Sequence, residues 1–330
     1  MLILAKASMA LMLGFVLSLI TGLFVIPLFK KLHFGQSVSK LISKRHLKKE
    51  GTPTMGGVIF ILPVIISLIL LYLKGSISIS YNLIIVVFVF LAYAFLGFID
   101  DYLKIKKHNN DGLSLVTKFL IQMIIALVFF YLFMKGGGRP ILSITFLNIN
   151  INLGWMFGLF ILFLLVGTTN AVNITDGLDG LAGGLSAIAF FAYGVISWNA
   201  GWLEGYQEIA IFCFLLTGAI VGFLVFNTHP ARIFMGDLGS LALGGALASV
   251  AIVSRHEISL AIIGGVFVIE TLSSMIQIIA IRYFNKKVFL KAPLHHHFEE
   301  LGWEEQDIIK MFWVVGFVLA MAAITYGVWL

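Results

Sequence analysis

Ten apolar segments, each close to the length of a membrane-spanning helix, constrain this chain more than any other feature of its sequence. A helix needs roughly 20 apolar residues to cross the hydrocarbon core of a bilayer. Only 12% of the residues are charged and 60% are hydrophobic, whereas ordinary soluble domains carry about 25% charged residues. We therefore expect an all-α integral membrane protein of about ten transmembrane helices, at residues 9–29, 55–73, 81–98, 119–134, 153–167, 180–198, 209–226, 238–254, 259–281 and 311–330.

The chain shows no internal repeat and no linker long enough to separate domains, so residues 1–330 are predicted to form one domain. The first apolar segment is not followed by a soluble mature chain, as a signal peptide would be, and is expected to stay as a span. The single cysteine, Cys213, falls in the seventh segment, which excludes an internal disulfide. Residues 139–152 alternate apolar with polar side chains and predict a short hairpin on the outer side.

Basic residues are divided unequally between the two sets of alternate loops. Of the 22 lysines and arginines, 17 lie in one set and 5 in the other. The positive-inside rule makes the richer side cytoplasmic and both termini periplasmic. Because these residues lie in short loops, the net charge of +6 favours membrane lipids or anionic substrates as partners over nucleic acid. All the aspartates lie on the cytoplasmic side too, which predicts an active site that faces the cytoplasm.

The third apolar segment ends in two adjacent carboxylates, Asp100 and Asp101. Carboxylates at a helix C-terminus oppose the helix dipole, so stability alone does not favour them there. A pair of this kind suits divalent-cation binding or general base catalysis. The alternative is a solvated helix end beside Lys104, Lys106 and Lys107.

Two further cytoplasmic loops combine carboxylates with glycine. In residues 170–184, two asparagines and two aspartates repeat at one-turn spacing among four glycines. Such a loop offers amides and carboxylates to a polar ligand. The alternative is an ordinary turn, which has a similar composition. In residues 226–240, Asp237 follows Gly236 at a helix start, where it serves either as a cap or as part of a phosphate and metal site. Phe234 is interpreted as a base-stacking residue or as an interfacial anchor.

The two remaining polar stretches are a basic loop and a run of histidines. Residues 48–57 offer lysine and threonine donors to anionic oxygen, although any cytoplasmic loop would contain lysines. Three consecutive histidines, His295, His296 and His297, lie in the last cytoplasmic loop, and without further ligands they favour phosphate contacts over zinc. Glu270 and Gln277 share a face of the ninth segment and either line a site or hold helices together.

Alternate loops bring all these motifs to one membrane face, so a bundle can gather them in one cleft. Carboxylates, glycine turns, amides, lysines and histidines together are typical of magnesium-dependent phosphoryl transfer. An apolar cosubstrate could enter from the bilayer between helices. An ion-coupled transporter would place its coupling residues near the membrane centre, which does not fit aspartates at one interface.

With these motifs, the chain resembles the phospho-N-acetylmuramoyl-pentapeptide transferases of the polyprenyl-phosphate N-acetylhexosamine-1-phosphate transferase superfamily. The matching stretches are GTPTMGG, DDYLK, NAVNITDGLDGLAGG, FMGDLGSLALGG and APLHHHFEELGWEE, in the family's order. The resemblance implies a homodimer of the bacterial inner membrane, with Mg²⁺ as cofactor. The implied substrates are UDP-MurNAc-pentapeptide and undecaprenyl phosphate, and the products are lipid I and UMP. A sister branch that transfers GlcNAc-1-phosphate typically has His-Ile-His-His where this chain has three histidines.

The resemblance also implies roles for individual residues. Asp237 would be the principal magnesium ligand, and Asp100 and Asp101 essential acidic residues near the metal and the attacking phosphate. Phe234 would stack on uracil. The residues that would bind the substrate are Lys49, Thr54, Asn170, Asn173, Asp176, Asp179, Asn227, Phe234, Gly236, Gln277, His295, His296 and His297. Ile174 replaces a usual Leu, and residues 37–46 lack an expected acidic residue and Gly-Pro.

Overall fold

The computed structural model describes residues 2–32, 34, 51–107, 111–144, 149–199 and 205–326, and these are almost entirely helical. The helices are α1 (Leu2–Lys31), α2 (Val58–Leu73), α3 (Tyr81–Lys107), α4 (Leu115–Lys135), α5 (Met156–Thr175), α6 (Leu181–Asn199), α7 (Tyr206–Asn227), α8 (Gly236–Val253), α9 (Glu257–Ile263), α10 (Gly265–Phe284), α11 (Leu294–Glu300) and α12 (Glu305–Ile324). The strands are β1 (Ile141–Ile144) and β2 (Ile149–Asn152).

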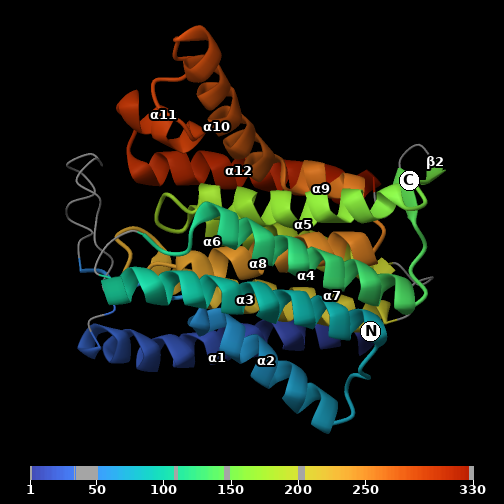
Figure 1. The fold of residues 1–330 in the computed structure, drawn as a ribbon. Coiled ribbons are helices and arrows are strands. Elements are labelled where there is room, and N and C mark those ends of the chain that lie inside the picture. Colours follow the sequence, from blue (N-terminus) through green and yellow to red (C-terminus); the bar gives the residue numbers. More distant parts are fainter. Residues whose placement is uncertain are drawn as a thin grey trace.

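The helices confirm an all-α, multi-pass membrane protein. Within the described residues, nine helices are long and apolar enough to cross a membrane, and α2 is an apolar helix of 16 residues. Each predicted segment coincides with a helix, but the ninth is divided at Gly264 into α9 and α10. Figure 1 shows α10 leaving the bundle at a steep angle, followed by α11. Apolar composition runs unbroken across this division, so the sequence pattern alone does not reveal the change of direction.

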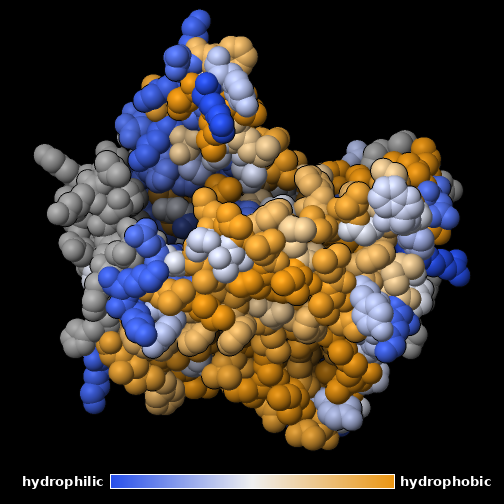
Figure 2. Space-filling model, viewed as in Figure 1, coloured by the Kyte–Doolittle hydropathy of each residue, from blue (hydrophilic) through white to orange (hydrophobic). Residues whose placement is uncertain are grey.

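The centre of the bundle is formed by α7 and α8, whose spans are the most enclosed. Helix α1 packs along α7, and α8 lies between α3 and α5. The peripheral helices carry exposed apolar side chains, and on α10 Ile278 is 63% and Phe284 is 70% exposed. Figure 2 shows an apolar band over the body, with hydrophilic side chains at both ends. Such a band is expected where side chains face lipid instead of water.

A small hairpin and both ends of the described chain mark one end of the bundle. Strands β1 and β2 are antiparallel, with Ile141 opposite Asn152, which confirms the hairpin predicted within residues 139–152. The start of α1 and the end of α12 lie at the same end as the hairpin (Figure 1). The connections from α5 to α6 and from α7 to α8 lie at the opposite end.

A buried carboxylate at the hairpin end makes stability depend on pH. Glu257, at the start of α9, is 2% exposed, and both its carboxylate oxygens lack a hydrogen-bond partner among the described residues. Burial raises its pKa to about 8, partly offset by the nearby Arg255. The folded protein therefore keeps a proton that the unfolded chain, with an ordinary pKa of 4.5, has lost. Stability contributed by this proton is lost as pH rises from about 4.5 through about 8.

Glu257→Gln is expected to remove this part of the pH dependence. Melting temperatures in detergent, measured between pH 6 and pH 9, should fall less steeply for the variant than for the parent protein. A variant with the same slope as the parent would show that Glu257 does not titrate in this range. Glu208→Gln, at the same end of the bundle, is the control for loss of one carboxylate.

Candidate active site

Three carboxylates meet where α3 packs against the start of α8. Asp100 and Asp101 are 2% and 3% exposed, and their oxygens lie within 4.8 Å of one another and of an oxygen of Asp237. The prediction that Asp100 and Asp101 lie at the end of their helix is wrong, because α3 continues to Lys107. Lysines in that last turn suit the negative end of a helix, which favours the continuation. The pair therefore lies within the helix and is held rigidly.

Two lysines partly neutralise the three carboxylates. Lys104 Nζ lies 2.6 Å from Asp100 Oδ2 and 3.1 Å from Asp237 Oδ2. Lys118 Nζ, from α4, lies 2.5 Å from Asp237 Oδ2. Counted by formal charge, three carboxylates and two ammonium groups leave one negative charge, which suits the approach of a cation. No sequence pattern marks Lys118 as a site residue, because it directly precedes the fourth predicted segment and resembles any lysine of a basic loop.

A side-chain amide and two backbone N–H groups bind further oxygens of the three carboxylates. Asn173 Nδ2 donates to Asp237 Oδ1 at 2.8 Å and to Ser240 Oγ at 2.8 Å. The side chain of Asp237 thus binds a neighbouring helix, and α8 has no side-chain cap, so the capping interpretation of Asp237 is not confirmed. The backbone N–H of Leu238 donates to Asp101 Oδ2 at 3.1 Å, and that of Leu113 to Asp100 Oδ1 at 2.9 Å.

Two glycines allow the carboxylates to come this close. A Cβ at Gly97, one turn before Asp100, would lie 2.2 Å from the backbone oxygen of Asp237. Gly236 has a φ of +74°, and a Cβ there would lie 2.4 Å from Asp101 Oδ2. Both positions therefore require glycine for the close approach of α3 and α8.

The cluster fits a hard divalent cation. Mg²⁺ prefers oxygen ligands and is usually held by one or two carboxylates together with substrate phosphates. Three carboxylates in one buried place, with excess negative charge, supply such a donor set. When bound, the ion would neutralise charge on phosphate oxygens.

The loop between α5 and α6 borders this cluster. Asn170 and Asn173 lie in the last two turns of α5, as their spacing predicts, and Asn170 Nδ2 donates to Gln122 Oε1 at 2.8 Å. Asp176 is the C-cap residue of α5. Asn173 thus reaches the carboxylate cluster, whereas Asn170 joins α5 to α4.

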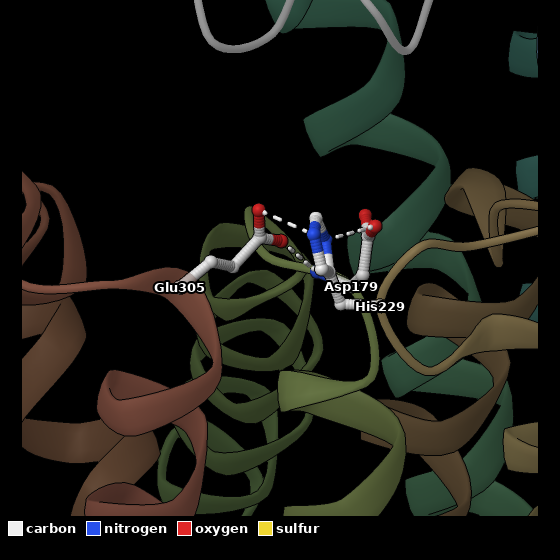
Figure 3. A group of neighbouring side chains, drawn as sticks. All are labelled: Asp179, His229 and Glu305. Atoms are coloured by element: carbon white, nitrogen blue, oxygen red, sulfur yellow. Dashed lines mark hydrogen bonds and ion pairs between the residues drawn. The ribbon is translucent and has the colours of Figure 1, made fainter.

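Asp179 belongs to a separate cluster, which joins three segments at the same end of the bundle. His229 Nδ1 lies 3.1 Å from Asp179 Oδ2 and 3.3 Å from Glu305 Oε2 (Figure 3). The backbone N–H of Asp179 also donates to Glu305 Oε1 at 2.8 Å, and that of Ala231 donates to Asp179 Oδ2 at 3.0 Å. These contacts connect the α5–α6 loop, the α7–α8 loop and the start of α12.

Thr54, Phe234 and Asn227 lie around the loop that precedes α8. Residues 53–56 pair with this loop, since the N–H of Phe234 donates to Pro53 O and the N–H of Gly56 donates to Phe234 O, both at 2.8 Å. Thr54 Oγ1 lies 2.9 Å from the Cβ position of Gly236. Asn227 is 2% exposed and donates to Ile233 O at 2.9 Å. Lys49 lies outside the described residues.

The three histidines lie on α11 and have different partners. His295 is 1% exposed, and its Nδ1 lies 2.8 Å from Glu270 Oε2. Its backbone N–H donates to the other oxygen of Glu270 at 3.0 Å. His296 Nδ1 lies 2.5 Å from Glu299 Oε2, and burial lowers the pKa of His296 in spite of this carboxylate.

His297 and Gln277 organise the segment that leads into α11. Leu290 N–H donates to His297 Nδ1 at 3.1 Å, which leaves Nε2 of the neutral ring as a donor. Gln277 Oε1 accepts from the N–H groups of Val288 and Phe289, and its Nε2 donates to Phe289 O. The amide of Gln277 is thus engaged by backbone.

One close contact links the histidines to the aspartate loop. His295 Nε2 is buried without a hydrogen-bond partner among the described residues. A Cβ added at Gly177 would lie 2.3 Å from this nitrogen. The structure therefore brings four of the predicted motifs together at one end of the bundle. The fifth, the basic loop, is described only from residue 51, and that part pairs with the loop before α8.

The fold and the site define a multi-pass membrane transferase, and comparisons with known proteins agree. Residues 83–255, more than half of the chain, match the model of glycosyl transferase family 4. Residues 49–61 match the phospho-N-acetylmuramoyl-pentapeptide-transferase signature 1.

Relatives of nearly the same length carry the same name. A phospho-N-acetylmuramoyl-pentapeptide-transferase of Geobacillus sp. (strain WCH70) is 46% identical over 322 residues, 98% of each chain. The protein of that name from Bacillus subtilis (strain 168) is 45% identical over 319 residues, 97% of each chain. The chain belongs to the phospho-N-acetylmuramoyl-pentapeptide-transferase family.

Proposed function

We propose that this chain transfers phospho-MurNAc-pentapeptide from UDP-MurNAc-pentapeptide to undecaprenyl phosphate, giving lipid I and UMP. Family membership over nearly the whole chain supports the reaction. The observation that carries the location of the chemistry is the buried cluster of Asp100, Asp101 and Asp237 at one end of the membrane bundle. This reaction is the first membrane step of peptidoglycan synthesis.

The proposed reaction is a direct displacement with Mg²⁺ as cofactor. An oxygen of undecaprenyl phosphate attacks the sugar-linked phosphorus, and the bond from that phosphorus to the bridging oxygen breaks, so that UMP leaves. A phosphate monoester has its second pKa near 6, so the attacking phosphate is already largely dianionic at neutral pH. Asp100 or Asp101 then holds the metal or removes a residual proton. Lys104 and Lys118 stabilise negative charge on the phosphates.

The other predicted residues surround the donor in this proposal. Phe234 stacks on uracil. The residues that bind or position the nucleotide sugar are Lys49, Thr54, Asn170, Asn173, Asp176, Asp179, Asn227, Gly236, Gln277 and the three histidines. Gln277 and Asn227 act through the backbone segments that they hold. His295 Nε2 lacks a partner within the described part of the chain. Because Nδ1 donates to the Glu270 carboxylate, Nε2 would donate to an anionic ligand in the doubly protonated ring.

Orientation and assembly complete the proposal. The cluster faces the cytoplasm of a bacterium, with the chain in the inner membrane and both termini in the periplasm. The unequal distribution of lysine and arginine supports this orientation. The protein acts as a homodimer, as the family resemblance implies.

Donor selectivity tests the proposal. Purified protein with undecaprenyl phosphate and magnesium is expected to release UMP from UDP-MurNAc-pentapeptide and not from UDP-GlcNAc. Turnover with UDP-GlcNAc but not with UDP-MurNAc-pentapeptide would instead assign the chain to the sister branch. Incubation with donor alone tests the direct displacement, because a trapped phosphosugar-enzyme species would establish a two-step route.

Glu270→Gln is expected to weaken donor binding through His295. The substitution replaces one carboxylate oxygen by an NH₂ group and leaves a buried imidazole imperfectly paired, at a cost of about 1 to 3 kcal/mol. We expect the KM for the donor to rise about tenfold or more, with a smaller change in kcat. Steady-state kinetics should show no such change for Glu300→Gln, on the exposed side of α11. An unchanged KM in Glu270→Gln would contradict the positioning role.

A further inference from the structure

A polar pocket lies at the hairpin end of the bundle, far from the carboxylates. It has a volume of about 570 Å³, and its polar lining includes Asn82, Arg139, Ser143, Asn150 and Arg255. Asn82 lies in the first turn of α3, the helix that carries Asp100, and the separation of the two along α3 is roughly 27 Å at 1.5 Å per residue. The pocket is therefore not part of the candidate active site.

Two arginines in this pocket, Arg139 and Arg255, have no ion-pair partner among the described residues. Arg139 and Arg255 lie close enough to repel each other, and Glu257 attracts Arg255. Among the described residues, neither guanidinium has a hydrogen bond or an ion pair, and the buried Glu257 oxygens form no hydrogen bond with Arg255. Guanidinium groups bind phosphate and carboxylate through paired N–H donors, so two free ones facing one pocket suit an anion.

The backbone at Arg255 does not explain why an arginine is there. Helix α8 ends in a Schellman motif, in which His256 N–H donates to Ala251 O at 2.9 Å and Arg255 N–H donates to Ile252 O at 3.1 Å. Arg255 occupies the left-handed position of this motif with a φ of 57°. Glycine is the usual residue there, since other side chains are strained. Local folding would favour glycine, so the explanation for arginine lies in its side chain.

We propose that the pocket bounded by Arg139 and Arg255 binds a phosphate group on the face of the membrane opposite the carboxylate cluster. The phosphate belongs either to the headgroup of an anionic phospholipid or to a soluble phosphate. Apolar residues at the pocket wall, Phe133, Ile141 and Val253, accompany the polar ones, as a site at a lipid interface requires.

Binding measurements on the full-length protein distinguish the two sources. The first arm measures phosphatidylglycerol binding to detergent-solubilised protein by native mass spectrometry, with phosphatidylcholine as reference lipid. The second arm titrates inorganic phosphate in a calorimeter. The variant is Arg139→Gln combined with Arg255→Gly, since glycine suits the backbone at that position. The control is Lys135→Gln, which removes one exposed charge at the same end of the bundle without altering the pocket lining.

The double variant is expected to bind the phosphate probe at least tenfold more weakly, whereas Lys135→Gln changes binding less than twofold. Weakening in the first arm alone identifies a lipid, and weakening in the second a soluble phosphate. UMP release and the melting temperature serve as checks that the double variant is folded. Equal weakening in Lys135→Gln, or binding unchanged in both arms, would overturn the proposal. So would loss of folding in the double variant together with unchanged binding in each single variant.

Discussion

Asp237→Asn is expected to lower the turnover number for UMP release by at least about a thousandfold, which corresponds to about 4 kcal/mol. Asp237 is the centre of the cluster, since it contacts Lys104, Lys118 and Asn173 at once. The amide keeps the size of the side chain and removes its charge. The cluster would then lose its excess negative charge, and with it the attraction for a divalent cation. Turnover is measured as UMP release at saturating substrates and magnesium.

Asp307→Asn is the matched control for this prediction. Asp307 lies on an exposed turn of α12 and pairs only loosely with Lys310, at 3.3 Å. Its substitution removes one carboxylate from the same end of the bundle and should leave turnover within about twofold. Near-normal turnover in Asp237→Asn would contradict the role of Asp237, provided that both variants elute as folded protein.

Gly97→Ala is expected to impair both stability and activity, although Gly97 touches no substrate in the proposed reaction. The added methyl group would lie 2.2 Å from the backbone oxygen of Asp237, and backbone cannot move aside as a flexible side chain can. Separation of α3 from α8 should lower the free energy of unfolding by about 1 to 3 kcal/mol. Displacement of Asp237 from its partners on α3 should lower turnover by at least about 100-fold.

Gly167→Ala provides the comparison, because nothing lies within 4 Å of the Cβ position of Gly167. Both substitutions add one methyl group to a membrane helix. Melting temperature and turnover of Gly167→Ala should match those of the parent protein. Equal behaviour of the two variants would show that the approach of α3 to α8 at Gly97 is not required.

The number of helices was predictable from sequence because lipid imposes a simple rule on each segment, and the hairpin was predictable from the alternation of apolar and polar residues. A span must be apolar over a fixed length, and that property can be read without knowing the partners of the helix. The division at Gly264 could not be read in this way, because the residues on both sides are equally apolar. The end of α3 was misplaced for the opposite reason, since a polar segment after Asp101 continues as helix.

The members of the candidate site were predictable where several polar residues occur together in a loop. Asp100, Asp101, Asp237 and Asn173 stand in dense polar motifs, and they meet in the structure. Lys118 stands alone at a helix start, and only the packing of α4 against α3 and α5 brings it to the cluster. A contact that depends on the arrangement of helices leaves no local pattern in the sequence.

Two residues of the ninth segment show how structure decides between alternatives that spacing leaves open. Glu270 and Gln277 share a face, as predicted, and each joins α10 to the segment that follows it. Glu270 holds His295 through two hydrogen bonds, whereas Gln277 holds the backbone at residues 288–289. Both residues therefore organise the approach to α11.

The central claim is that this chain uses the cluster of three aspartates for magnesium-dependent transfer of phospho-MurNAc-pentapeptide. Purified protein with UDP-MurNAc-pentapeptide labelled in the peptide and with undecaprenyl phosphate tests it most directly. The label should move into the lipid-soluble fraction as UMP appears in equal amount, and removal of magnesium by a chelator should stop both. Transfer that continues undiminished in the chelator, or UMP release without labelled lipid, would contradict the claim.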